Sequence, residues 1–134
     1  VKVLELLLCL DAAEPSEDEK RQYFYRTQIE KVKAIKTFLT ENMSDNFTQE
    51  ALSEQFEIPL TTMKSCFRSV YGTSIGAWLT GFRMNRAAEM LINDRNKSAA
   101  EIAGLVGYDS ASKFAAAFKR IMGRTPIEYR KDIR

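Results

Sequence analysis

The sequence predicts an all-α fold in which two helix-turn-helix units are joined by a rigid spacer helix, about seven helices in total. Residues 98–129 read as a small amphipathic helix, a glycine with a short polar turn, and a second helix with Phe114 and Phe118 on one face. Residues 48–72 show the same arrangement. Two such units in one small basic domain indicate a protein that reads duplex DNA with two helices.

The two units align as an internal repeat. The offset is 50 residues before the turn and 51 residues after it, so the second turn is one residue longer. The matched pairs are Leu52 with Ile102, Ser53 with Ala103, Met63 with Phe114, Phe67 with Phe118, Arg68 with Lys119, and Gly72 with Gly123. A match at this many positions disfavours the alternative of two similar helical hairpins without a special role.

Charge is distributed unevenly along the 134 residues, a length that allows one ordinary domain and a little more. Residues 1–25 carry three basic and six acidic side chains, whereas the remaining residues carry 17 basic and 12 acidic ones. Residues 110–134 alone have seven basic and two acidic side chains. Basic charge gathered at one end favours a polyanionic partner.

Side chains that enzymes and metal sites commonly use are scarce. The sequence has no histidine, and its two cysteines, Cys9 and Cys66, are far apart without zinc-ligand spacing. Each cysteine is expected to be a small buried residue in a reducing cytosol, and Cys66 on an inward face is a poor nucleophile. We therefore expect no catalytic site, no metal, no cofactor and a cytoplasmic location.

Residues 1–10 are expected to form an amphipathic helix with Val1, Leu4 and Leu8 on one face. The segment is too short to span a membrane, and no signal peptide is present. It is either a short core helix of this chain or the terminal helix of a missing upstream sensor or dimerisation domain. We favour the second interpretation because the sequence does not begin with Met.

Residues 11–26 are expected to form an acidic, solvated linker, and residues 27–134 the DNA-binding domain. Ser16 with Glu19 could still begin a helix through a capping box, and Thr27 with Glu30 offers a second start of this kind. A helical apolar stripe follows at Ile29, Val32, Ile35 and Leu39. This helix is expected to end near residues 42–46.

In the first unit, Thr48 is expected to cap a helix whose inward residues are Ala51, Leu52 and Phe56. Residues 57–59 are expected to form the turn, and Pro59 suits the start of the helix that follows. The inner stripe of that helix is Met63, Cys66, Phe67 and Val70. Gly72 is expected to end it in a left-handed conformation.

Ser74 is expected to start the spacer helix, in which Gly76 and Gly81 would mark close helix–helix approach. Ser98 with Glu101 predicts a capping box at the second unit, and Gly107 is expected to have a positive φ. The inner positions of the next helix are Phe114, Ala117, Phe118 and Ile121. The closing helix is expected to start with Thr125, Pro126 and Glu128.

A recognition helix lies in the major groove and reads bases from its N-terminal half. The base-reading candidates are Thr61, Thr62, Lys64 and Ser65 in the first helix, and Ala111, Ser112, Ala115 and Ala116 in the second. Basic residues suited to phosphates are Arg68 in the first helix and Lys113, Lys119 and Arg120 in the second. The alternatives are a solvated face for each basic residue and simple helix propensity for the alanines.

Together these residues resemble the AraC/XylS family of bacterial transcription regulators over residues 27–134. The matching spacer-helix positions are Arg83, Met84 and residues 87–91. In the second unit they are Ile102, Ala103, Gly107, Tyr108, Phe114, Phe118, Lys119, Gly123, Pro126, Tyr129 and Arg130. The sequence departs from the family where Glu57 stands at the place of Gly107, and where Ala115 and Ala116 replace the larger polar residues of many relatives.

The resemblance implies seven helices, binding to double-stranded promoter DNA, and contact with RNA polymerase. The two units would enter successive major-groove segments on one face of the DNA, about 34 Å apart. Family members usually carry a separate upstream domain, so the resemblance also implies homodimer contact through that missing domain.

The leading hypothesis is a sequence-specific double-stranded DNA-binding transcription regulator, or its C-terminal fragment. The alternative is a helical protein-interaction module that binds a regulator or RNA polymerase without DNA. The basic outward faces argue against it, and duplex binding that weakens steeply with salt would separate the two. A third class, an enzyme that carries the same module, is disfavoured by the absence of histidine and of clustered carboxylates.

Overall fold

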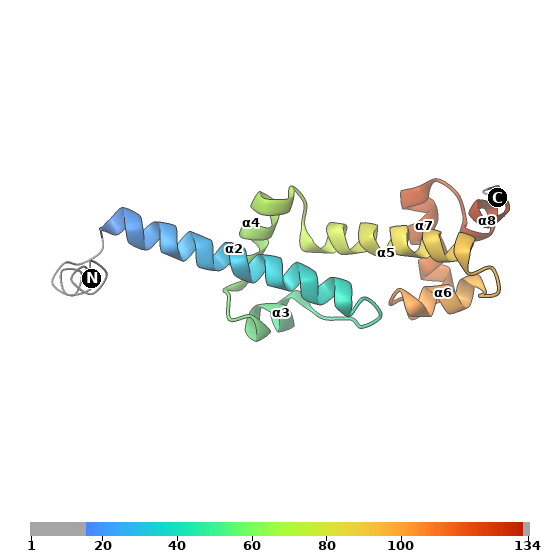
Figure 1. Cartoon of the computed structure of the whole chain (residues 1–134). Coiled ribbons are helices and arrows are strands. Elements are labelled where there is room, and N and C mark those ends of the chain that lie inside the picture. Colours follow the sequence, from blue (N-terminus) through green and yellow to red (C-terminus); the bar gives the residue numbers. More distant parts are fainter. Residues whose placement is uncertain (1–15, 133–134) are drawn as a thin grey trace, which may run out of the picture.

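The computed structural model describes residues 16–132, within which all regular structure is helical. The helices are α2 (Glu17–Glu41), α3 (Gln49–Gln55), α4 (Leu60–Tyr71), α5 (Ile75–Asn93), α6 (Ala99–Leu105), α7 (Ala111–Met122) and α8 (Pro126–Asp132). In Figure 1, α5 runs between two groups of helices, α2–α4 at one end and α6–α8 at the other. This confirms the expected all-α fold with two helix-turn-helix units and a joining helix.

The first unit has its own core. α4 packs against α2, α3 and the start of α5. The buried side chains are Val32, Ile35 and Leu39 of α2, Leu52 of α3, Ile58 of the turn, Met63 and Phe67 of α4, and Ile75 of α5. The three to four residues that separate the buried positions of α2 place them on one face of that helix. Phe38 closes the edge of this core, with its ring centre 4.9 Å from Phe47 and 5.6 Å from Phe56.

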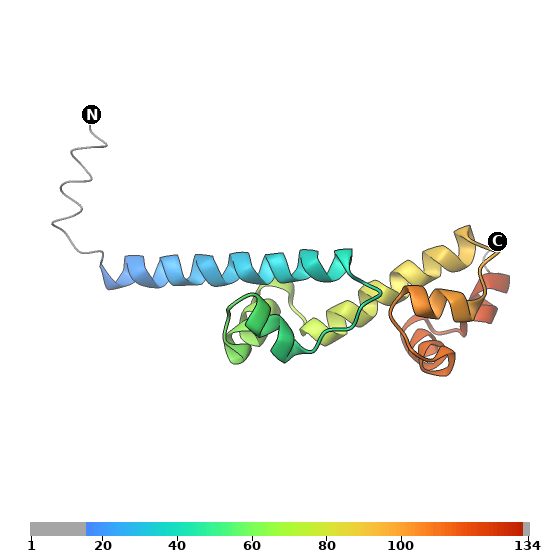
Figure 2. The ribbon, with the colours of Figure 1, turned by 90° about the horizontal axis from the view of Figure 1, so that it is seen from below.

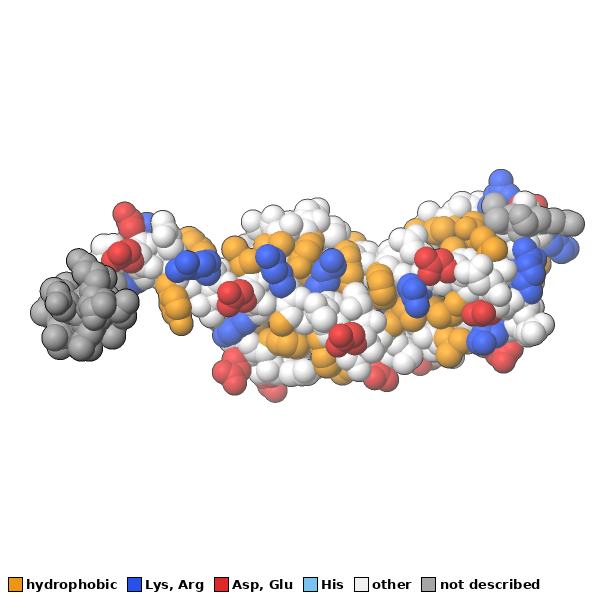
Figure 3. Space-filling model, viewed as in Figure 1, with side chains coloured by type: hydrophobic (Ala, Val, Ile, Leu, Met, Phe, Trp, Pro, Cys, Tyr) orange, Lys and Arg blue, Asp and Glu red, His pale blue; other side chains and the backbone are white. Residues whose placement is uncertain are grey.

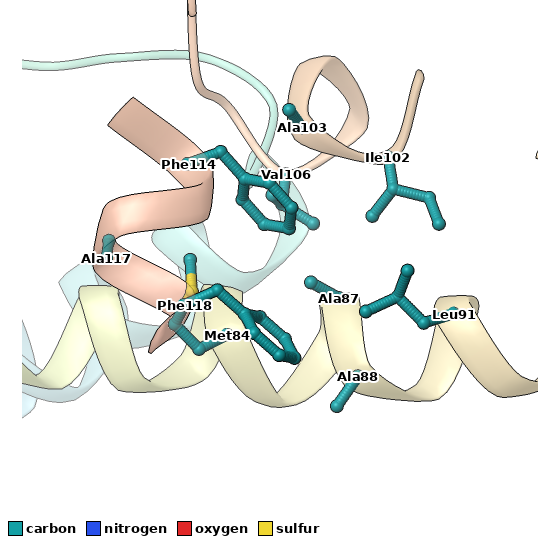
Figure 4. Packing of buried hydrophobic residues seen from close by; sticks show 10 residues of the cluster. All are labelled: Met84, Ala87, Ala88, Leu91, Ile102, Ala103, Val106, Phe114, Ala117 and Phe118. Atoms are coloured by element: carbon teal, nitrogen blue, oxygen red, sulfur yellow. The ribbon is translucent and has the colours of Figure 1, made fainter. Parts of the chain in front are cut away.

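The second unit packs α6, α7 and α8 against α5. In Figure 4 the side chain of Phe114 lies toward Ala103 and Val106, whereas that of Phe118 lies between α7 and α5. Phe118 is fully buried in one cluster with Ile102, Val106 and Phe114, as expected from the sequence. The Phe118 ring centre is 5.4 Å from that of Tyr129, so α8 also contacts the recognition helix.

The sequence repeat is also a structural repeat. α3 and α6 have 7 residues each, and α4 and α7 have 12 each. The turn of each unit closes with the same backbone hydrogen bond, from Ile58 N–H to Ser53 O at 3.0 Å and from Tyr108 N–H to Ala103 O at 2.8 Å. Both recognition helices end at a left-handed glycine, with φ of +76° at Gly72 and +84° at Gly123.

Four predicted helix starts are confirmed by side-chain hydrogen bonds. The hydroxyl oxygens of Thr48, Ser74, Ser98 and Thr125 each accept from the backbone N–H three residues later, at 3.0–3.2 Å. The Glu101 carboxylate in turn accepts from the Ser98 N–H at 2.9 Å, which completes the capping box. This contact with Ser98 lowers the pKa of the Glu101 carboxyl, because the backbone N–H stabilises the carboxylate form.

The beginning of α2 differs from expectation. Residues 17–26 form the first turns of α2, because the helix begins at the alternative start: Ser16 and Glu19 form a complete capping box. Thr27 is an interior residue of α2 whose hydroxyl donates to Tyr23 O at 2.9 Å. Residues 1–10, expected to be a separate helix, lie outside the described residues, and the division into domains stays a prediction.

The first turns of α2 extend past the rest of the first unit (Figure 2). Three consecutive aromatic side chains in this part, Tyr23, Phe24 and Tyr25, are 68%, 50% and 54% exposed. Between residues 16 and 132, every helix is too short or too polar to cross a membrane.

Some predicted inward positions are wrong. Ala51 is exposed and Ile121 is 39% exposed. The helical phase of each points toward the inner stripe, but the packing does not bury it. Ile121 lines an open hollow beside Gly76, Ala77, Thr80 and Gly81 of α5. The suggested close approach at Gly76 and Gly81 is also wrong, since no atom of another helix lies within 4 Å of where a β-carbon would stand at either position.

Candidate nucleic-acid interface

The two recognition helices lie on the same side of the molecule. In Figure 1 both α4 and α7 run across the long axis of α5. Seen from below in Figure 2, both lie along the edge opposite α2. The opposite face, which carries α2, has basic, acidic and apolar side chains intermixed and no continuous basic patch (Figure 3).

Packing fixes which face of α4 meets solvent. Met63 and Phe67 are fully buried beneath the helix. The predicted residues on the other face, Thr61, Lys64, Ser65 and Arg68, are all exposed, and Thr62 is half-buried. α4 therefore presents hydroxyl and cationic groups along its solvent face, as the sequence predicted.

The same division holds for α7. Phe114 and Phe118 are at most 1% exposed and anchor the inner face. The predicted outward residues Ala111, Ser112, Lys113, Ala116, Lys119 and Arg120 are exposed, and Ala115 is half-buried. The N-terminal half of α7 thus presents mostly methyl groups, and its cations stand at Lys113 and toward the C-terminal end.

The basic residues of these faces are not neutralised by ion pairs in the described part of the chain. The salt bridges there join Arg21 with Asp18, Arg86 with Glu89, and Arg124 with Asp132. Hydrogen bonds from Thr125 lower the pKa of the Glu128 carboxyl, and Lys119 and Arg124 add a smaller attraction. The cations of α4 and α7 therefore remain able to contact an anionic partner.

A surface hollow accompanies each recognition helix, and sequence reasoning missed both. In the first unit the hollow is lined by Gln49, Lys64, Arg68, Ser74 and Ile75. The hollow of the second unit is lined by Ala99, Ala111, Ser112, Phe114, Ala115, Thr125, Pro126 and Ile127. By the offsets of 50 and 51 residues, Gln49 is equivalent to Ala99 and Lys64 to Ala115. The two hollows therefore occupy equivalent places in the repeat, so the sequence repeat relates one hollow to the other.

The two hollows have opposite chemistry. The first is lined by two cationic side chains, Lys64 and Arg68, and by the polar side chains of Gln49 and Ser74. In the second, alanines replace Gln49 and Lys64, and Ile127, which is 62% exposed, adds apolar surface. Equivalent places in the two units are therefore suited to different contacts, an anionic one at α4 and an apolar one at α7.

The described residues hold no group of three or more cysteine, aspartate or glutamate side chains placed to bind a metal ion. Cys66 is half-buried, with its thiol unpaired, at a groove between α2 and α4. What distinguishes this surface is the pair of exposed faces of α4 and α7.

Comparison with known proteins agrees with this geometry. Residues 52–132 match the family model of a helix-turn-helix domain. The chain is 30% identical over 128 residues to the transcriptional regulator ExsA of Pseudomonas aeruginosa, covering 96% of this chain and 46% of ExsA. It is 33% identical over 95 residues to an AraC-like transcription regulator of Streptomyces lividans, covering 71% of this chain and 31% of that protein.

Among solved structures, the DNA-binding domain of the transcription factor AdpA in complex with a target DNA is similar, with a TM-score of 0.72 and 26% identity. That match covers 75% of this chain and 90% of the AdpA domain. The chain spans less than half of the length of the two curated relatives just described.

Proposed function

The chain belongs to the AraC-type family of helix-turn-helix DNA-binding transcription regulators, and on that premise we propose that it reads promoter DNA with α4 and α7 together. The two helices enter successive major-groove segments on one face of the duplex, about 34 Å apart. Recognition is sequence-specific and needs no cofactor.

The observation that carries this proposal is the repeated amphipathic helix. α4 is anchored by the fully buried Met63 and Phe67, and α7 by the buried Phe114 and Phe118. Both helices expose their opposite faces on the same side of the molecule. A long helix between them, α5, links the two units. Two exposed helices held on one side of the molecule suit a DNA site with two adjacent half-sites.

Roles follow from position along each helix. The base-facing groups are Thr61, Thr62, Lys64 and Ser65 of α4, and Ala111, Ser112, Ala115 and Ala116 of α7. The phosphate contacts are Arg68 of α4, and Lys113, Lys119 and Arg120 of α7. The cationic hollow at Lys64 and Arg68 supports an anionic partner on the first unit.

Further partners are expected of the complete regulator. The family resemblance favours a separate sensor or dimerisation domain, which would supply signal sensing and homodimer contacts. RNA polymerase is the expected protein partner at the promoter, and the place of action is the bacterial cytoplasm. Activation of transcription is the favoured outcome, since the similar protein VirF of Yersinia enterocolitica is a transcriptional activator.

Binding to a random-sequence duplex library over a range of salt concentrations tests the function. We expect selection of a defined site, and affinity that falls with salt along a log–log slope of several units, because each neutralised phosphate contributes about 0.9. Single-stranded DNA of the selected sequence serves as the control and should bind more weakly. Failure to select any duplex, or affinity independent of salt, would contradict the proposal.

A protein-interaction module that does not bind DNA is the alternative, and one observation favours it. The hollow beside Ala115, Pro126 and Ile127 is apolar and open, as a docking site for a protein side chain would be. The same experiment separates the two functions, because such a module would select no duplex at any salt concentration.

A further inference from the structure

A buried arginine lies at the junction of the two units. Arg83, near the middle of α5, is only 9% exposed. Its Nη2 donates to the Asp45 carbonyl at 3.0 Å and to Asn46 Oδ1 at 3.1 Å. Both acceptors lie in the loop between α2 and α3, so Arg83 ties the first unit's loop to the joining helix.

The same loop is tied to the second unit. Asn46 Nδ2 donates to the Gly107 carbonyl at 3.1 Å, in the turn between α6 and α7. The Arg83 guanidinium carbon lies 5.9 Å from the centre of the Tyr108 ring in that turn. Arg83 and Asn46 thus connect three segments: the loop of the first unit, α5, and the turn that leads into α7.

Backbone packing at this junction is close. A β-carbon on Gly107 would stand 2.7 Å from the Met43 carbonyl oxygen and 2.8 Å from Arg83 Nη2. The side chain of Met43 packs against the core of the second unit, although it follows α2 in sequence. The two units are therefore joined both by α5 and by this contact between the loop after α2 and the turn before α7. We expect the relative orientation of the units to depend on both.

Placing a charged arginine at this buried position costs desolvation free energy. Burial lowers the pKa of its guanidinium, which Tyr108 only partly offsets, and its Nε is buried without an acceptor. An apolar side chain of similar length would fill the space with less desolvation. The guanidinium, by contrast, fixes both the distance and the direction of its acceptors in the loop between α2 and α3, because its N–H donors lie in one rigid plane.

We propose that Arg83, acting with Asn46, is a positioning residue that sets the register between α4 and α7 and so the half-site spacing that the protein accepts. The inference rests on the proposed function, since spacing matters only to a protein that reads DNA with both helices. One extra base pair moves the second half-site by about 3.4 Å and turns it by about 35°. A protein with a fixed junction should bind sites with one half-site spacing. A protein with a loosened junction should also bind sites in which that spacing is one base pair longer or shorter.

The test compares the full 134-residue chain with Arg83→Met, Asn46→Ala and Arg86→Met. Arg86→Met is the matched control, because Arg86 lies on the same helix but is exposed and, within residues 16–132, forms its ion pair with Glu89. Each protein selects sites from a random duplex library. Affinities are then measured on the best site with one base pair inserted or deleted between the half-sites.

We expect the wild-type protein and Arg86→Met to enrich a single spacing. A one-base-pair change should cost them about 5- to 150-fold in affinity, the loss of about one base contact of 1–3 kcal/mol. Arg83→Met and Asn46→Ala should enrich neighbouring spacings as well, with a penalty below about 5-fold. The ratio between spacings is the readout, because a role confined to folding would weaken all spacings equally.

Thermal unfolding of each variant accompanies the selection. Where Arg83→Met does not fold, Asn46→Ala decides, since it removes the bond to Gly107 without emptying the core. An unchanged spacing profile in the folded variants, or equal weakening at every spacing, overturns the inference while leaving the DNA-binding function intact. If the wild-type chain selects no duplex, the proposed function fails, and this inference fails with it.

Discussion

Glu57 and Gly107 occupy the same left-handed backbone position in the two units, with φ of +54° and +93°. In each case the carbonyl accepts from a side chain of an earlier segment, Lys31 Nζ to Glu57 O at 2.6 Å and Asn46 Nδ2 to Gly107 O at 3.1 Å. The departure noted in the sequence, a glutamate where a glycine is expected, therefore leaves the turn geometry intact and places a strained residue there.

Glu57→Gly should stabilise the protein by about 0.5–1 kcal/mol. Relief of left-handed strain, about 1–2 kcal/mol, exceeds the conformational entropy that glycine adds to the unfolded chain. Urea unfolding measures the change. Glu54→Gly, an exposed position inside α3, is the control and should lose about 1 kcal/mol. Destabilisation by Glu57→Gly would show that the glutamate side chain contributes more than the strain costs.

Gly107→Ala should destabilise the protein by more than about 1 kcal/mol, the cost of the left-handed conformation alone. The added β-carbon would also meet the Met43 carbonyl, a backbone atom that cannot easily move away. Gly104→Ala is the matched control: it lies within α6 in open space and should gain about 0.5–1 kcal/mol. Equal effects of the two changes on the unfolding midpoint would refute the close junction.

Phe118→Ala should cost about 3–5 kcal/mol of stability and abolish DNA binding, because it empties a fully buried site between α7, α5 and α8. Phe24→Ala, at an exposed position, is the control and should change stability by less than about 0.5 kcal/mol. Thermal unfolding and duplex binding are the measurements. A Phe118 variant that folds and binds as the wild type does would sink the assignment of the inner face of α7.

Arg68→Ala and Lys119→Ala should weaken binding to all sequences alike, each lowering the log–log salt slope by about one unit. Both residues are exposed, and they lie beyond the halves of α4 and α7 that we propose face the bases. Binding titrations at several salt concentrations measure the slope. Lys33→Ala on α2 is the control and should leave it unchanged. We would abandon the phosphate role if neither recognition-helix variant altered the slope.

The two recognition helices should read unequally. α4 offers the hydrogen-bonding groups of Thr61, Thr62, Lys64 and Ser65, each good base contact being worth about 1–3 kcal/mol of discrimination. In α7, Ala115 and Ala116 offer only methyl contacts, best suited to thymine, and Ser112 is the main polar group. The backbone contacts of Lys113, Lys119 and Arg120, together with DNA shape, should then supply most of the affinity of the second unit.

Saturation mutagenesis of the bound site tests this inequality. Base substitutions under α4 should weaken binding more than those under α7, and Lys64→Ala should relax the preference at one or two base pairs of the first half-site. Ser69→Ala, on the same helix beyond its base-facing half, should leave base preference unchanged. Equal or greater sensitivity in the second half-site would show that the alanines contribute more to recognition than methyl contacts allow.

Local structure was predictable from the sequence because its causes lie within a few residues. The caps at Thr48, Ser74, Ser98 and Thr125 bond to amides three positions along, and the prediction for each is confirmed. The left-handed ends of both recognition helices follow from glycine's freedom at positive φ. The repeat, the all-α fold and the outward faces of α4 and α7 needed no knowledge of long-range packing.

Only the tertiary structure decided what covers each face. Ile121 has an inward helical phase yet is 39% exposed, since burial depends on how closely another segment packs there. The packing of Met43 against the second core and the hydrogen bonds of Arg83 to Asp45 and Asn46 join residues that are far apart in sequence. Such contacts leave no periodic pattern, because they depend on where the chain returns in space and not on how it coils locally.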